Sequence, residues 1–337
     1  MSADPAAAAD RSRDPAPSAR KTPIWQKALP YVGTLAIFAL IFWRIPLAKV
    51  GEALKQAPVL KFIGVFLPFS AFFWMIDSTC LTWVVRRFNA PMRFRDILPI
   101  RASMYLLALI NTPLGQGGVA YYLHRKANIP FLEALSSILF IALLEVYQLF
   151  LFSTLGVIFY LPTAPAQIET VNVLRVFYVI AWGLLFALIA LFAIARRKPA
   201  LHEWIATSRG GAIAGTFLKA RPLDYAIVLG IKAPSFLASL LTQYFALSLY
   251  GIAIPFVKLM LFLPLVFLAA ALPIAVAHLG TSQAAWLLFF SGNATEAKIL
   301  AYSLAAHFTF MFCNGVIGLF FLPRASRELT ALETSES

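Results

Sequence analysis

Two ionisable residues, Glu145 and Lys232, lie well inside long apolar stretches of the sequence, where a charge is costly. Glu145 lies about mid-way along residues 131–161, and Lys232 lies eight residues into residues 224–250. A carboxylate and an ammonium reduce this cost when they pair, and a pair that lines a cavity can open to bind a phosphate and an amine. The alternatives are a purely structural pair and a Lys232 side chain that extends to the membrane surface.

Four other polar residues inside apolar stretches are weaker candidates. The guanidinium of Arg101 suits a phosphate near the cytoplasmic headgroups, although membrane anchoring explains this residue equally well. His278 and His307 are single histidines in apolar surroundings, where a histidine more often makes a structural hydrogen bond than binds a ligand. For Asp77, helix packing or capping near the inner boundary is favoured over transport. Arg101 and His278 are therefore kept as candidate binding residues.

The composition identifies the class of protein. Of 337 residues, 61% are hydrophobic and 13% are charged, and the apolar residues form runs long enough to cross a bilayer. We expect an all-α polytopic membrane protein with a transmembrane domain at residues 24–323, between a disordered cytoplasmic tail at 1–23 and a second cytoplasmic tail at 324–337. About six transmembrane helices are predicted, at residues 24–43, 61–84, 131–161, 173–195, 224–250 and 296–322.

The distribution of Lys and Arg predicts the orientation of the chain. The expected inner segments carry eighteen of these residues, and the expected outer segments carry six. This bias places both termini in the cytoplasm. It also accounts for the net charge of +13, so no nucleic-acid partner is expected. Residues 44–61 carry four basic residues on the nominally outer side, and we interpret them as an amphipathic helix at the membrane surface.

Two remaining apolar segments, residues 97–123 and 259–292, are interrupted by proline and glycine and resemble each other. An offset of 165 residues aligns residues of the same type, including Pro99 with Pro264, Gly115 with Gly280 and Asn128 with Asn293. Leu and Ala match easily by chance in such a chain, whereas Pro, Gly and Asn do not. The sequence therefore predicts an internal duplication.

Three predicted crossings separate the two interrupted segments, so the second segment would enter the membrane from the opposite face. This arrangement is an inverted repeat, which many secondary transporters use to build a site that opens to either side. The repeat copies are predicted at about residues 61–161 and 224–322, each with a re-entrant helical hairpin. An ordinary helix kinked by glycine and proline is the alternative.

Glycine and proline mark the predicted hairpin tips, because a tight turn needs their backbone conformations. The predicted tip residues are Pro113, Gly115, Gly117 and Gly118 in the first hairpin and Gly280 in the second. Asn111 would offer its amide to backbone groups that the first turn leaves unpaired, because such groups are costly in lipid.

Residues 111–145 (NTPLGQGGVAYYLHRKANIPFLEALSSILFIALLE) and 272–289 (LPIAVAHLGTSQAAWLLF) resemble the flippase-like transmembrane domain of the bacterial lysylphosphatidylglycerol synthases. The resemblance extends from about residue 24 to residue 323. It implies a protein of the bacterial cytoplasmic (inner) membrane that moves a lipid to the outer leaflet, in that family an aminoacylated phosphatidylglycerol. Only fourteen residues follow Pro323, so no aminoacyl-transferase domain is expected and the chain would not make the lipid itself.

The sequence departs from the family pattern at both hairpin tips. The family usually has an acidic residue after the first tip glycine and a basic one shortly beyond, where this chain has Gln116 and then Gly117-Gly118. In the second copy a glutamate often follows the tip glycine by three residues, where this chain has Gln283. Gln116 and Gln283 can still bind a substrate through hydrogen bonds. A cationic headgroup would lack its counter-charges at these tips.

The favoured function is a lipid translocase that moves a phospholipid or lipid-linked molecule between leaflets. Its expected partners are membrane lipids, and a separate lipid-synthesising enzyme is a candidate partner. One alternative is a membrane-embedded transferase that uses a lipid-linked donor, although the sequence shows no catalytic motif. The other is an accessory subunit of a lipid-modifying enzyme. No metal and no cofactor are expected, and the oligomeric state is open.

Overall fold

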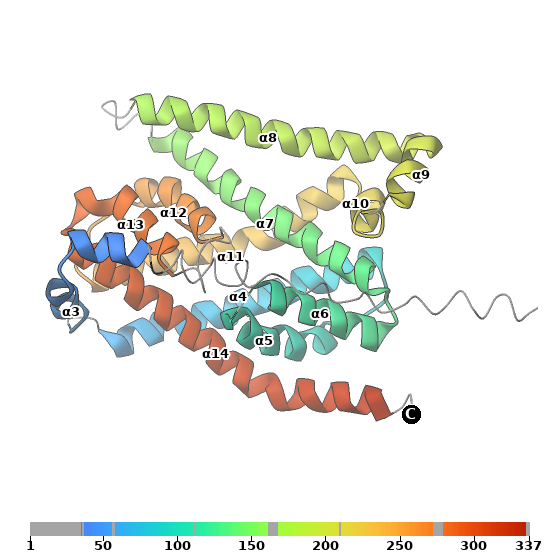
Figure 1. Cartoon of the computed structure of the whole chain (residues 1–337), viewed down its shortest axis with the longest axis horizontal. Coiled ribbons are helices and arrows are strands. Elements are labelled where there is room, and N and C mark those ends of the chain that lie inside the picture. The colour runs from blue at the N-terminus through green and yellow to red at the C-terminus, as the bar shows by residue number, and fades with distance from the viewer. Residues whose placement is uncertain are drawn as a thin grey trace, which may run out of the picture.

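The computed structural model describes residues 35, 37–55, 58–110, 112–160, 168–208, 210–271 and 279–334. Across these ranges the chain is helical and no residue lies in a β-strand (Figure 1). The helices are α3 (Leu47–Lys55), α4 (Val59–Phe88), α5 (Phe94–Ile110), α6 (Thr112–Ala127), α7 (Phe131–Tyr160), α8 (Ile168–Arg197), α9 (Pro199–Thr207), α10 (Gly215–Lys219), α11 (Pro222–Leu249), α12 (Phe256–Ala270), α13 (Thr281–Phe290), the 3₁₀ turn η5 (Ser291–Asn293) and α14 (Glu296–Thr334).

Five helices of the described chain, α4, α7, α8, α11 and α14, are long and apolar enough to cross a membrane. Helices α4 and α7 have 30 residues each. At 1.5 Å per residue such a helix is about 45 Å long, which exceeds a hydrocarbon core of about 30 Å and requires tilt. Figure 1 shows α7 crossing the molecule obliquely. The chain is therefore an all-α multi-pass membrane protein, as predicted.

Two predicted segments near the N-terminus are only partly described. Residues 1–23 and most of the expected span 24–43 lie outside the described ranges, although residues 37–44 are helical. The expected surface segment 44–61 contains the short helix α3, of which Val50 is buried. An exposed ion pair between Arg44 and Glu296, with 2.6 Å between Nη2 and Oε1, ties this region to the start of α14.

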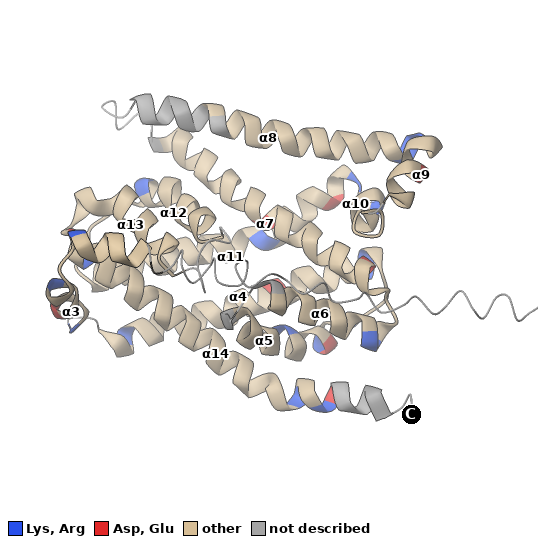
Figure 2. Cartoon of the chain, in the orientation of Figure 1, with Lys and Arg blue, Asp and Glu red and all other residues tan. Residues whose placement is uncertain are grey.

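Charged side chains gather at the two ends of the molecule, with few between them (Figure 2). Helices α4, α6 and α8 each finish in a basic turn, with Arg86 and Arg87, then His124 to Lys126, and then Arg196 and Arg197. These three turns lie at the same end of the molecule, on the right in Figure 1. This pattern is the one from which the sequence predicts a cytoplasmic face.

The helices occur in two sets of four, α4 to α7 and α11 to α14. The starting residues of corresponding helices differ by 162 to 169, close to the offset of 165 found in the sequence. In Figure 1, α5 runs inward from the right end and α6 returns to it, whereas α12 runs inward from the left end and α13 returns there. The two helix pairs therefore enter the molecule from opposite ends.

The predicted tip of the first hairpin is wrong in its details. Pro113, Gly115, Gly117 and Gly118 do not form a turn, because all four lie within α6. A proline fits the first turn of a helix, where its missing N–H would have no intrahelical acceptor. Gly115 permits close packing of the hairpin, since a Cβ there would lie 3.0 Å from the carbonyl oxygen of Met104 on α5. Asn111 lies outside the described residues.

The second hairpin does use its glycine as a turn. Gly280 precedes α13 and has φ +93°, a conformation that favours glycine. Its N–H donates to Oε1 of Gln283, at 2.7 Å, so Gln283 caps the start of α13. Gln283 is completely buried. His278 lies outside the described residues.

The last helix of each set packs on the hairpin of the other set, and each contact is made at a glycine. A Cβ on Gly156 of α7 would overlap the backbone of Leu261 on α12. A Cβ on Gly318 of α14 would lie 2.9 Å from the carbonyl oxygen of Ala102 on α5 and 2.8 Å from Cγ of Leu106. The two sets are thus interlocked through close helix contacts.

Helix α14 continues past the predicted boundary at residue 323, since Pro323 lies inside it and the helix ends at Thr334. Oε2 of Glu328 accepts a hydrogen bond from the Tyr122 hydroxyl at 2.8 Å and from Lys126 Nζ at 2.7 Å. Both donors lie on α6. The extension of α14 is therefore attached to the first hairpin.

Candidate functional site

A cluster of four charged side chains lies inside the helical bundle. Asp77 of α4 is its centre: Oδ1 accepts a hydrogen bond from Nζ of Lys232 on α11 at 2.8 Å, and Oδ2 accepts one from Nε of Arg101 on α5. The hydroxyl of Tyr105 also donates to Oδ2, at 3.2 Å. Nζ of Lys232 lies 2.5 Å from Oε1 of Glu145 on α7. We call Asp77, Arg101, Glu145 and Lys232 the charge cluster.

The cluster contains two acids and two bases, so its net charge is zero. The side chains of Asp77 and Lys232 are 1% and 4% exposed, whereas that of Glu145 is 39% exposed. Burial makes each charge costly, and its partners offset that cost only while the pairs stay intact. Glu145 is therefore the member that an incoming ligand can reach with the smallest rearrangement.

The local sequence around Lys232 favours a rearrangement at this point of α11. Pro234 lies inside the helix and supplies no N–H, so the backbone hydrogen bond to residue 230 is missing. The hydroxyl of Ser235 donates instead to the Lys232 carbonyl, at 2.7 Å. The proline thus weakens the helix beside the cation that holds two carboxylates.

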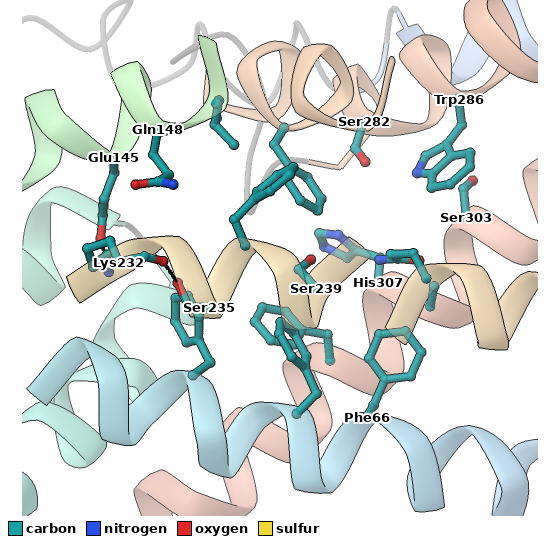
Figure 3. A pocket seen from close by; sticks show the side chains of 18 residues that line it. Phe66, Glu145, Gln148, Lys232, Ser235, Ser239, Ser282, Trp286, Ser303 and His307 are labelled. Carbon is teal, nitrogen blue, oxygen red and sulfur yellow. Dashed lines mark hydrogen bonds and ion pairs between the residues drawn. The ribbon is translucent and has the colours of Figure 1, made fainter. Parts of the chain in front are cut away.

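A cavity of about 310 Å³ begins at the charge cluster (Figure 3). Much of its wall is aromatic, and the Phe and Trp side chains come from both sets of helices: Phe66, Phe69, Phe73, Phe236, Phe267, Trp286 and Phe310. Glu145 and Lys232 are the charged side chains on this wall, and they lie together at one end of the view in Figure 3. The cavity therefore combines a charged end with a long apolar surface.

Other polar side chains also line the cavity, namely Gln148, Ser235, Ser239, Gln243, Ser282, Ser303 and His307. Gln148 lies three residues after Glu145 on α7 and points into the cavity (Figure 3). It is 4% exposed, and neither Nε2 nor Oε1 has a hydrogen-bond partner among the described residues. An unpaired buried amide is unfavourable, so this side chain indicates a place for a polar ligand group.

A much smaller cavity of about 20 Å³ also borders the charge cluster. Asp77, Arg101, Gln116 and Glu145 line it, and Glu145 also lines the large cavity. Members of the charge cluster therefore face both spaces.

The match to known proteins agrees with this membrane architecture. Residues 29–318 match the family described as the lysylphosphatidylglycerol synthase transmembrane region. The chain belongs to this family. No individual curated protein matches the chain significantly. Membership of the lysylphosphatidylglycerol synthase transmembrane-region family indicates a role connected with membrane lipids.

Several of the residues that the sequence proposed for the site lie close together in the structure. Glu145 and Lys232 form an ion pair, a question that the sequence left open. Gln116 lies beside them in the small cavity. Arg101 does not lie among headgroups at the surface as expected, because it is paired with buried Asp77. Gln283 caps α13, so the structure gives it a local role, and its substrate contact stays a prediction.

Sequence reasoning favoured helix packing or capping for Asp77 and did not single out Gln148. Asp77 is only nine residues from Arg86, which suggested a position near the inner boundary. Charge balance was the signal that could have found it: Lys232 and Arg101 are two cations in apolar stretches, and Glu145 alone can neutralise only one of them. Gln148 gave no such signal, because an uncharged amide is common in membrane helices.

Proposed function

We propose that this chain is a lipid translocase, which moves a phospholipid or a lipid-linked molecule between the leaflets of the membrane. The observation that carries the proposal is the large cavity, with a charged end at Glu145 and Lys232 and an aromatic wall beyond. A lipid has the same division, because its headgroup is charged or polar and its chains are apolar. Membership of a lipid-associated membrane family supports the same reading.

The charge cluster would act as the barrier between the two sides. Lys232 holds Asp77 and Glu145 together, and members of the cluster border both cavities, so the intact cluster would keep the two cavities apart. A headgroup that replaces one of these ion pairs would compensate the charges as the barrier opens. Two helix pairs that enter from opposite ends provide elements that can move on either side, as in other inverted-repeat transporters.

The orientation and setting belong to the same proposal. The basic ends of α4, α6 and α8 would face the cytoplasm, with both termini on that side and the protein in the bacterial cytoplasmic membrane. The chain would transport without chemical catalysis, and a separate enzyme would make the lipid. No cofactor takes part in this scheme.

The test is the transfer of fluorescent phospholipids between leaflets in proteoliposomes, measured by their accessibility to an added quencher. Glu145→Gln and Lys232→Met remove one member of the ion pair, and we expect either change to lower the transfer rate roughly tenfold or more. Glu133→Gln is the matched control, since Glu133 lies on the same helix in a partly exposed ion pair with Lys219.

If the folded wild-type protein moves no lipid faster than protein-free vesicles do, the proposal is wrong. If Glu133→Gln lowers the rate as much as Glu145→Gln, the charge cluster has no special role. Size-exclusion profiles in detergent establish that each variant is folded before transfer is measured.

A further inference from the structure

The charges that face the large cavity restrict the headgroup that it can accept. Glu145 and Lys232 supply one negative and one positive charge, and the other two members of the cluster, Asp77 and Arg101, also balance each other. A ligand that enters without breaking this balance must itself be neutral overall. This inference rests on the proposed lipid transport and identifies the class of lipid.

A neutral headgroup can still open the ion pair if it carries both charges. Its ammonium would take the place of Lys232 on the Glu145 carboxylate, and its phosphate would accept the hydrogen bond that Lys232 releases. Lys232 would keep its bond to Asp77 throughout. Each charge is paired before and after this exchange, so the buried site never holds an uncompensated ion.

Headgroups with a net charge cannot make this exchange without leaving one charge unpaired. An anionic phosphate could pair with the Lys232 ammonium, but the Glu145 carboxylate would then have no cation beside it. A headgroup with an excess ammonium could pair with the Glu145 carboxylate, but the site would then hold one unpaired positive charge. In both cases one charge inside the cavity lacks its partner, which is unfavourable.

The unpaired amide of Gln148 favours a headgroup in which a hydrogen-bond donor lies beside an acceptor. Its amide has an unpaired donor at Nε2 and an unpaired acceptor at Oε1, three residues from Glu145 on the same helix. A primary ammonium can donate to Oε1 and to Glu145 together, and a phosphate oxygen can accept from Nε2. A quaternary ammonium has no N–H to donate.

We propose that the large cavity binds a zwitterionic phospholipid headgroup with a primary amine, with Glu145 and Gln148 holding the ammonium and Lys232 holding the phosphate. Aminoacylated, net cationic lipids and anionic lipids would be poorer substrates. Ethanolamine phospholipids have the required headgroup chemistry.

The experiment compares headgroups in proteoliposomes of the full-length chain, with the fluorescent label on the acyl chain so that the headgroup is unaltered. The probes are an ethanolamine phospholipid, phosphatidylglycerol, lysylphosphatidylglycerol and a neutral glycolipid. We expect the ethanolamine lipid to move at least about fivefold faster than each of the others. The anionic and cationic headgroups leave one charge unpaired, and the glycolipid has no charges with which to open the ion pair.

Two charge-changing variants make the specificity argument sharper. Glu145→Gln leaves the cluster with one excess positive charge, so the preference should shift toward phosphatidylglycerol. Lys232→Gln leaves one excess negative charge, so the preference should shift toward lysylphosphatidylglycerol. The readout is the ratio of rates for two lipids in one variant, and a merely structural loss would lower both rates without changing their ratio. Gln148→Leu changes no charge and should leave the ratio of phosphatidylglycerol to lysylphosphatidylglycerol unchanged.

The outcomes separate this inference from the proposed function. If the wild-type chain moves none of the four probes, lipid translocation itself is overturned. If it moves lipids but favours the anionic, the cationic or the sugar headgroup, or does not distinguish among the four, translocation stands and the zwitterion assignment is wrong. Opposite shifts in the two charge variants would support the exchange at Glu145 and Lys232.

Discussion

The two hairpins occupy corresponding places in the repeat but carry different side chains. On α5, Arg101 and Tyr105 bond to Asp77 in the charge cluster. The offset of 165 places Val266 and Ala270 of α12 at the corresponding positions. The first hairpin therefore contributes charge to the site, whereas the second contributes apolar and hydroxyl groups to the cavity wall.

The same asymmetry extends to the flanking helices. At the same offset, Glu145 of α7 corresponds to Phe310 of α14, and both side chains line the large cavity. Asp77 corresponds to Thr242. The duplicated backbone thus places two sets of side chains around one cavity, and three of the four members of the charge cluster, Asp77, Arg101 and Glu145, come from the first copy. In this protein the repeat determines where the cavity lies, and the side chains of the first copy, together with Lys232, determine its charge.

The largest expected effect is at Asp77, compared with its counterpart Thr242. Asp77→Ala leaves Arg101 and Lys232 with only the Glu145 carboxylate, and removing one member of a buried ion network costs about 3–5 kcal/mol of stability. Thr242→Ala removes a buried hydroxyl at the corresponding place and should cost about 1 kcal/mol. Thermal unfolding of both variants in the same detergent measures the difference.

Asp77→Asn sharpens this prediction, because it keeps the size of the side chain and one of its two acceptor oxygens while removing the charge. It should be nearly as destabilising as Asp77→Ala if charge is what matters. Equal stability of Asp77→Ala and Thr242→Ala would contradict the importance of the buried carboxylate that only the first copy carries at this position.

The large features of the fold follow from the sequence, because length and apolarity alone specify a membrane-spanning helix. The predicted spans 131–161 and 224–250 agree with α7 and α11 to within a few residues. The Glu145–Lys232 pair was predictable for a related reason, since two opposite charges in apolar surroundings each need a partner.

Features that depend on packing were not predictable in this way. Gly115 and Gly118 looked like turn residues, but their function depends on how closely α5 approaches α6. Arg101 looked like a surface anchor, because its partner Asp77 is 24 residues away in the sequence and on another helix. Periodicity and composition contain no information about such contacts.

A second prediction compares the two glycine contacts that interlock the repeat copies. Gly156→Ala and Gly318→Ala each place a methyl group against backbone atoms of the other copy's hairpin, so each should destabilise the protein by about 1–3 kcal/mol. Gly183→Ala on α8 is the control, since a Cβ there has no neighbour within 4 Å. It should be neutral or stabilising by up to about 1 kcal/mol. Chemical denaturation in mixed micelles gives all three values.

Similar losses of stability in Gly156→Ala and Gly318→Ala would indicate that the two helix contacts between the repeat copies are equally important. This would hold although the two hairpins differ in charge. If only one of the two alanine variants is destabilised, the interlocking is not symmetric and the repeat copies differ in packing as well as in charge.

The smallest expected effect distinguishes two interpretations of Gln283, a substrate contact or a helix cap. Gln283→Met removes the bond from the Gly280 N–H to Oε1, but it also removes Nε2, which is buried and has no partner among the described residues. Because these two effects oppose each other, the net loss of stability should be about 1 kcal/mol or less. Lipid transfer should remain near the wild-type rate, measured in the proteoliposome assay with Gln148→Leu as the comparison, since Gln148 points into the cavity. A large loss of transfer in a stable Gln283→Met protein would instead place Gln283 on the transport path, and would give the second hairpin a polar role that its buried cap does not require.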